Sequence, residues 1–169
     1  MRKVIKFIYS KFLIGWHPFK KSKCCIAQTS VEFLGHQIDC NGIKPPPSKV
    51  ESLNILERTK DNKEVVRMLG MFGFYQRYIA NLAKIVFPLR RLAKQLDFAW
   101  TDVHQQAFED IKSAMVEAIQ LTFLKKNCHF TITANASSHE ICACLNQVDD
   151  GIGNPVLFFS RKLSDTKTR

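Results

Sequence analysis

The stretch HFTITANASSHEICACLNQVDDGIGNPVLFFSRK, residues 129–162, decides the second half of the fold. Polar and apolar residues alternate in three parts of it, residues 129–134, 140–147 and 155–161. A period of two is typical of β-strands, and the polar segments between these parts are short, so we expect an antiparallel three-stranded meander. The middle strand is apolar on both faces, which predicts that other parts of the fold cover both of them.

The chain before the meander has helical periodicity. We expect four helices, at residues 48–56, 61–79, 82–94 and 101–118. Capping-box patterns start the first helix at Ser48 with Glu51 and the second at Asp61 with Glu64. Thr101 is the expected N-cap of the fourth helix.

The second of these helices has the clearest pattern in the chain. One face carries a stripe made of Val65, Leu69, Phe72, Gln76 and Ile79. Its aromatic side, which holds Phe72, Phe74, Tyr75 and Tyr78, could stack on nucleic-acid bases. At helical spacing, however, such residues more often belong to the core.

Two further elements are expected before residue 48. An apolar stripe predicts a helix at residues 3–14, and residues 25–38 are typical of a β-hairpin with its polar turn at Gln28–Ser30. Asn41-Gly42 is a second turn signal. The expected fold class is therefore α+β, with a β-hairpin and a helical region followed by the three-stranded meander.

The charge of the chain points to an anionic partner. Its 169 residues are 46% hydrophobic, which excludes wholesale disorder, and carry a net charge of +10. Such a balance favours contact with nucleic acid or with an anionic membrane surface. The apolar N-terminal stretch is interrupted by Lys6 and Lys11 and is too short to span a bilayer, so we expect no membrane partner.

Asn135 draws attention because it ends a buried-looking strand and begins the glycosylation pattern Asn135-Ala136-Ser137. The six cysteines follow no secretory signal and have no zinc-ligand spacing, so a reducing, intracellular location in the cytoplasm or nucleus is the default. Asn135 would not meet the glycosylation machinery there. We therefore interpret it as something other than a sugar acceptor.

Four ordered blocks carry a resemblance. They are VEFLGHQIDCNGIKPPPSKVESL (31–53), LGMFGFYQRYIANLAKIVFPLRRLAK (69–94), FAWTDVHQQAFEDIKSAM (98–115) and VLFFSRKLS (156–164). In order and spacing the chain resembles, over about residues 20–169, the reverse transcriptases of gypsy-type LTR retrotransposons. The resemblance implies three parts: residues 1–47 as the end of the palm with a hairpin similar to the primer grip, residues 48–124 as thumb and connection helices, and residues 125–169 as part of an RNase H-like domain.

The resemblance also implies a binding surface for RNA–DNA or DNA duplexes. Its hairpin is Phe33-Leu34-Gly35-His36, in which the glycine would let the backbone approach a primer strand closely. A thumb holds a duplex by its phosphates without reading sequence, so it needs cations on a rigid helical body. The candidate cations are Arg77, Lys84, Arg90, Arg91 and Lys94.

Catalysis by this chain alone is not expected. Val148-Asp149-Asp150 imitates part of the polymerase motif, but it follows Gln147 and the thumb, so a turn at Asp150-Gly151 is the better interpretation. In the family the first RNase H strand ends in a metal-binding aspartate, and Asn135 stands in its place. The other carboxylates of the family follow the third strand, beyond Arg169. We therefore expect no catalytic residue, no metal site and no cofactor, although the family uses Mg²⁺.

Three functions stay open. The first is a retrotransposon-derived reverse transcriptase fragment, inactive by itself, that keeps duplex binding and associates with a complete Pol protein. The second is a domesticated or pseudogene-derived, non-catalytic interaction protein, whose uncovered apolar sheet faces would favour aggregation. The third, an unrelated basic helical DNA-binding protein, disregards the four ordered blocks.

Overall fold

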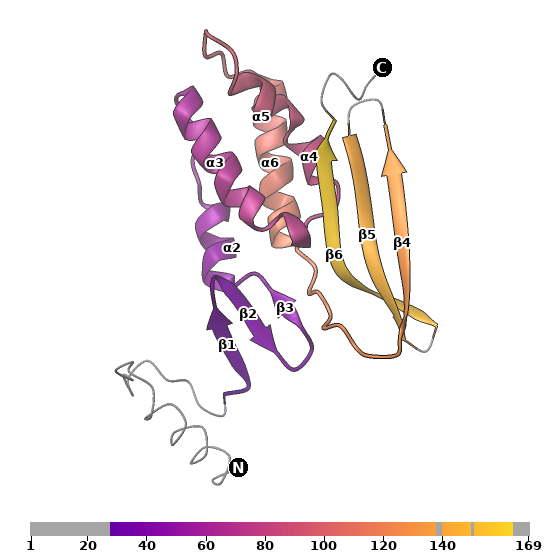
Figure 1. Ribbon diagram of the computed structural model, residues 1–169. Coiled ribbons are helices and arrows are strands. Elements are labelled where there is room, and N and C mark those ends of the chain that lie inside the picture. The colour runs from indigo at the N-terminus through magenta and orange to yellow at the C-terminus, as the bar shows by residue number, and fades with distance from the viewer. Residues whose placement is uncertain (1–27, 138–139, 150, 164–169) are drawn as a thin grey trace, which may run out of the picture.

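The fold is described here from a computed structural model, which describes residues 28–137, 140–149 and 151–163. The expected helix at residues 3–14 lies outside the described residues. In the described residues, one antiparallel sheet lies beside a layer of helices and a second, smaller one lies at the end of that layer (Figure 1). No helix in this part of the chain is both long and apolar enough to cross a membrane.

The first sheet is a small meander in the order β1-β2-β3, formed by Ser30–Phe33, His36–Asp39 and Ile43–Lys44. Its first turn is Leu34-Gly35, where both residues have left-handed backbone angles, with φ of 49° and 75°. The turn expected at Gln28–Ser30 is wrong, because Ser30 already pairs with Asp39. The turn lies at Gly35, which can adopt the left-handed conformation, and not at the polar residues 28–30.

The helical layer consists of α2 (Pro47–Asn54), α3 (Asn62–Phe74), the 3₁₀ helix η2 (Gln76–Tyr78), α4 (Leu82–Ile85), α5 (Phe87–Leu92) and α6 (Asp102–Val116). Two expected starts are confirmed: the Asp61 carboxylate accepts a hydrogen bond from the Glu64 amide, and Thr101 caps α6 together with the His104 side chain. The cap expected at Ser48 is wrong. Pro46 is the N-cap of α2, and Pro47 opens it with a φ already suited to a helix.

Two expected helices are shorter than their periodicity suggests. The second ends at Phe74 and continues only as the η2 turn. The third is divided at Val86 into α4 and α5. Pro88 explains this break, because it has no backbone N–H and its ring would clash with the carbonyl group of residue 84 in one continuous helix.

The core of the protein lies between the helices. Val65, Phe72 and Ile79 from the expected stripe are all buried in it, whereas Gln76 is exposed. Of the aromatic side chains, Phe72, Tyr75 and Tyr78 are buried, so they belong to the core as expected. Ile43 of the first sheet and Phe158 of the second sheet pack against the same cluster, which joins the two sheets to one helical body.

The second sheet confirms the expected meander. Its order is β4-β5-β6, formed by His129–Ala136, Glu140–Asp149 and Ile152–Lys162, with every pair antiparallel. Asp149 pairs with Ile152, and Gly151 between them has a φ of 80°, as the turn expected there requires. Figure 1 shows β6 beside the helices and β4 at the far edge.

Only one face of this sheet packs on the helices. Phe158 contacts the core, and the Ser160 hydroxyl accepts a 2.6 Å hydrogen bond from the Ala83 amide on α4. Ile132, on the opposite face, is 72% exposed, and Ile141 and Phe159 are exposed beside it. The prediction that β5 is covered on both faces is therefore wrong for the residues that the structure describes.

Candidate nucleic-acid interface

Basic side chains gather on α4, α5 and the turn that follows them. Leu89 and Leu92 of α5 are fully buried, so the helical period directs Arg90 and Arg91 outward. Lys84 and Lys94 are exposed as well. Among the described residues, none of these four cations forms an ion pair. They are therefore available to an external anion.

A fifth cation joins them from the second sheet. A hollow of about 340 Å³ is lined by Val66, Phe87, Arg90, Arg91, Ala93, Lys94 and Lys162, and we call it the α5 groove. Four of these residues are cations and none is a carboxylate. Lys162 Nζ lies 5.3 Å from the centre of the Phe87 ring, and Arg91 Cζ lies 6.0 Å from it, so both cations lie within cation–π distance of this ring.

Sequence reasoning missed Lys162. The signal that could have found it is the strand period, because Phe158, Ser160 and Lys162 point to the same side of β6. Once Phe158 is assigned to the core, Lys162 must lie on the helix-facing side of the sheet. The contact between Lys162 and Phe87, however, depends on tertiary packing alone.

The hairpin tip is the second candidate region. Phe33 is 59% exposed and Leu34 is 74% exposed. Gly35 is confined: a Cβ atom there would lie 3.4 Å from the Phe74 ring, and its φ is positive. The tip thus presents two apolar side chains on a tight backbone turn.

Aromatic side chains hold this hairpin to the end of α3. His36 stacks on Phe74 with the ring centres 5.1 Å apart and the planes 6° from parallel. The Tyr78 hydroxyl lies 2.9 Å from His36 Nδ1, and the Tyr75 hydroxyl donates to the Gly35 carbonyl oxygen at 3.2 Å. Burial lowers the pKa of His36, and the nearby charge of Arg77 lowers it further.

The predicted site residues thus form two groups. Arg90, Arg91 and Lys94 line the α5 groove, with Lys84 in the adjoining pocket. Phe33, Leu34, Gly35 and His36 form the hairpin tip, and Arg77 belongs with them through its charge on His36. In Figure 1 the hairpin sheet lies at the opposite end of the helical layer from α5.

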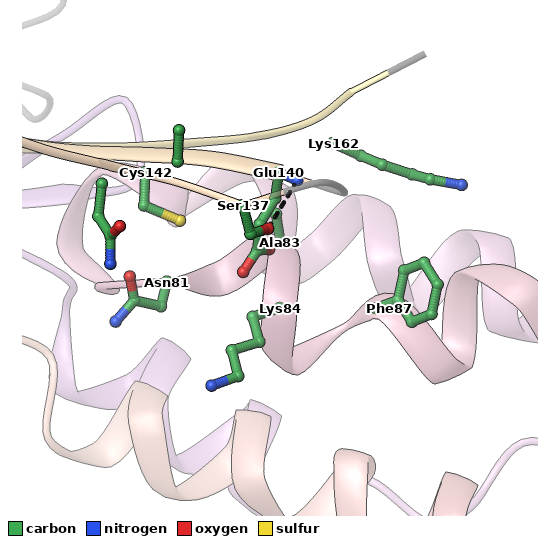
Figure 2. Close-up of a pocket in the computed structure, with 10 residues that line it drawn as sticks. Asn81, Ala83, Lys84, Phe87, Ser137, Glu140, Cys142 and Lys162 are labelled. Carbon is green, nitrogen blue, oxygen red and sulfur yellow. Dashed lines mark hydrogen bonds between the residues drawn. The ribbon is translucent and has the colours of Figure 1, made fainter. Parts of the chain in front are cut away.

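Asn135 lies in a pocket of about 420 Å³ between the second sheet and the helices. Its lining consists of Asn81, Ala83, Lys84, Phe87, Asn135, Ala136, Ser137, Glu140, Cys142 and Lys162. Figure 2 shows Ser137 and Glu140 at the sheet side, with Asn81 and Lys84 across from them. The Ser137 hydroxyl accepts a hydrogen bond from the Glu140 amide.

The residues around Asn135 do not fit a two-metal site. Such a site needs several carboxylates around hard cations, and Glu140 is the one carboxylate in the lining. Within residues 28–137, 140–149 and 151–163, no three His, Cys, Asp or Glu side chains are grouped as metal ligands would be. The pocket instead offers amides, a hydroxyl and ammonium groups, all of which can donate hydrogen bonds.

Comparison with known sequences identifies relatives of the chain. Residues 100–169 match the RNase H-like domain found in reverse transcriptase. The retrovirus-related Pol polyprotein from transposon opus of Drosophila melanogaster is 32% identical over 151 residues, covering 82% of this chain and 15% of the relative. The Pol polyprotein from transposon 297 of the same species is 30% identical over 165 residues, covering 95% of this chain and 15% of the relative. The chain thus spans less than a fifth of the length of these relatives.

Solved structures confirm the fold. The foamy viral protease-reverse transcriptase in complex with RNA/DNA hybrid superposes with a TM-score of 0.85, covering 99% of this chain and 23% of that one. The complex of the foamy viral protein with dsDNA gives 0.83, covering 99% of this chain and 35% of that one. Sequence identity is 21% in both cases, so the likeness establishes the arrangement of helices and antiparallel sheets.

Proposed function

We propose that this chain, a relative of retrotransposon Pol polyproteins with a reverse-transcriptase RNase H-like domain at residues 100–169, binds RNA–DNA or DNA duplexes by their phosphate backbones. The foamy viral proteins of the same fold were solved with dsDNA and with RNA/DNA hybrid, which supports the choice of ligand.

The α5 groove is the observation that carries the proposal. Arg90, Arg91, Lys94 and Lys162 converge on one hollow that no carboxylate lines. Like charges brought together without counter-ions repel one another and destabilise the free protein. A phosphate backbone removes that repulsion and releases its own counterions, so the groove is best matched by a polyanion.

The hairpin tip supplies a second contact in this proposal. Leu34 has a left-handed backbone conformation, which is strained for leucine. Its side chain is largely exposed, so burial of the side chain does little to offset the strain. Strain of this kind persists where the surrounding structure enforces it, and it clusters at binding sites. We assign Phe33 and Leu34 to apolar contact with sugars or base edges, and the backbone at Gly35 to close approach.

We also propose that the chain by itself is not catalytic. The family resemblance places Asn135 where a metal-binding aspartate would stand, and the pocket around it holds one carboxylate. We propose that the chain alone neither hydrolyses RNA–DNA nor extends a primer, and that it uses no Mg²⁺. Assays of both reactions with Mg²⁺ or Mn²⁺ test this, and activity above a buffer control would overturn it.

Fluorescence anisotropy with a labelled RNA–DNA duplex over a salt series tests the binding. Each lost phosphate contact should lower the slope of log K against log salt by about 1. Arg91→Ala and Lys94→Ala should each do so, whereas Lys49→Ala, which removes an exposed lysine of α2 outside the groove, should not. No binding at low salt would refute duplex binding. Equal effects of all three variants would show that the α5 groove is not the binding site.

A non-catalytic interaction protein is the second candidate. The apolar face at Ile132, Ile141 and Phe159 is exposed, and a patch of this kind marks a protein contact. Its partner would be a complete Pol protein, and either function would place the chain inside the cell, in the cytoplasm or nucleus. Ile132→Asn should then abolish co-purification with Pol and leave duplex affinity unchanged; unimpaired co-purification would exclude this face.

A further inference from the structure

Building on the proposed duplex binding, we infer that His36 is a positioning residue: its neutral ring locks the hairpin tip to the end of α3, and protonation of the ring releases the tip. In this role His36 holds Phe33 and Leu34 in place and does not itself contact the ligand.

The lock consists of three contacts from one short segment. Phe74, the last residue of α3, stacks on the His36 ring. Tyr75 binds the Gly35 carbonyl group, and Tyr78 of η2 binds His36 Nδ1. The two strands of the hairpin are thereby fixed at the turn itself, where Phe33 and His36 pair. Two of these three contacts are made by the His36 ring, so the orientation of the tip depends on that ring.

A neutral imidazole satisfies the Tyr78 hydroxyl group best. Tyr78 is 1% exposed, and burial raises the pKa of its hydroxyl group, so the hydroxyl group keeps its proton and needs an acceptor for it. A neutral His36 with an unprotonated Nδ1, 2.9 Å away, can supply that acceptor. In the charged ring Nδ1 carries a proton, so the tyrosine oxygen could only accept from it, and the buried hydroxyl proton would lose this acceptor.

The charged groups around the His36 ring also favour its neutral form. Arg77 on η2 faces His36 and disfavours a second positive charge. Glu32 on β1 acts on Tyr75, where burial first and this carboxylate second raise the pKa of the hydroxyl group, so Tyr75 also stays a donor. Because the pKa of His36 is lowered in the docked hairpin, docking is stable above the ordinary pKa of histidine and is lost as pH falls through the lowered value.

The sign of the pH effect separates this role from direct binding. A histidine that touches phosphate gains affinity when it becomes charged, since the ligand is an anion. A histidine that holds the tip loses affinity when it becomes charged, because the tip is no longer fixed. The two roles therefore predict opposite trends as pH falls.

Tyr78→Phe gives the matched comparison for duplex binding, because it keeps the buried ring and removes only the hydrogen bond. At pH about 7.5 the wild type should bind a primer–template duplex about fivefold more tightly than Tyr78→Phe, the factor for one hydrogen bond. The ratio should fall towards about one near pH 5, since protonation of His36 removes the acceptor of the Tyr78 proton in the wild type. Titration of the other histidines affects both proteins equally and therefore cancels in this ratio of affinities. His129→Phe, at an exposed position of β4, should leave the ratio unchanged when it is introduced into both proteins. A ratio that is constant or rises as pH falls overturns the inference.

Nuclear magnetic resonance of the free protein decides the matter without any ligand. The His36 ring should titrate with a midpoint below 6.5, and the amide signals of Leu34 and Gly35 should shift with the same midpoint. In Tyr78→Phe the His36 midpoint should move upward. Leu34 and Gly35 amides that do not follow His36 would overturn the inference. If they follow it while no duplex binds at low salt, the lock stands and the proposed function fails.

Discussion

Leu34→Asn should make the protein more stable and weaken its binding to a duplex. Three residues other than glycine have positive φ in the described part of the chain: Leu34, Asn81 and Asn127. Asparagine adopts this conformation readily, and leucine does not. Leu34-Gly35 occupies a two-residue hairpin turn with positive φ at both positions, for which Asn-Gly is the preferred pair.

The size of the effect follows from strain and burial. A left-handed conformation costs a residue with a Cβ atom about 1–2 kcal/mol. About a quarter of the Leu34 side chain is covered, and losing that burial costs about 0.5 kcal/mol. The net gain of about 1 kcal/mol should raise the melting temperature by about 2–4 °C. Loss of an apolar contact should at the same time weaken duplex binding.

Urea unfolding and duplex anisotropy on the same variant test both halves. Leu96→Asn is the matched control, because Leu96 is fully exposed and has no positive φ, and it should change stability by less than about 0.5 kcal/mol. A less stable Leu34→Asn variant would refute the strain argument. A more stable variant with unchanged affinity would refute the assignment of Leu34 to the duplex contact.

Three further substitutions test other parts of the structure. Gly42→Ala should lower the free energy of unfolding, measured in urea, by more than about 3 kcal/mol. Gly42 has a φ of 151°, and a Cβ atom there would lie 2.0 Å from the Leu121 carbonyl oxygen. A decrease in this free energy of less than about 1 kcal/mol would contradict this packing. Ser160→Ala should cost about 1–2 kcal/mol by leaving the Ala83 amide without its acceptor, and an unchanged midpoint would show that water replaces the hydroxyl group. Asn135→Asp should bind Mg²⁺ weakly and still not hydrolyse RNA–DNA, since Glu140 is then its one carboxylate neighbour in the pocket; hydrolysis by this variant would overturn the inactive assignment.

The elements that were predictable from the sequence are those whose signal is local. The period of two fixed the three strands of the second sheet, and Asp61 and Thr101 marked helix starts that the structure confirms. Pro88 was a local signal as well, but the prediction of one helix over residues 82–94 did not take it into account. Periodicity reports which side of a segment is buried, and two short helices can share one buried side.

The rest depends on contacts between distant residues. The hairpin turn at Leu34-Gly35 is disfavoured by leucine, and it forms where Tyr75 and Phe74 hold it, so the local pattern favoured the wrong turn. The α5 groove needs Lys162, which reaches Phe87 only after β6 has packed on α4. Neither contact leaves a trace in the nearby sequence.

The two regions proposed to bind nucleic acid are also those where the chain departs from its local preferences. Leu34 takes a conformation that suits asparagine or glycine, and the α5 groove brings four cations together without a carboxylate. Each arrangement destabilises the free protein, and a polyanion in the groove would offset the repulsion between its cations. The pocket at Asn135 shows less conflict, since Asn81 suits its positive φ and the lining of the pocket includes the carboxylate of Glu140 beside Lys84 and Lys162. Because departures from local preference concentrate at functional sites, this contrast favours binding at the hairpin and the groove over chemistry at Asn135.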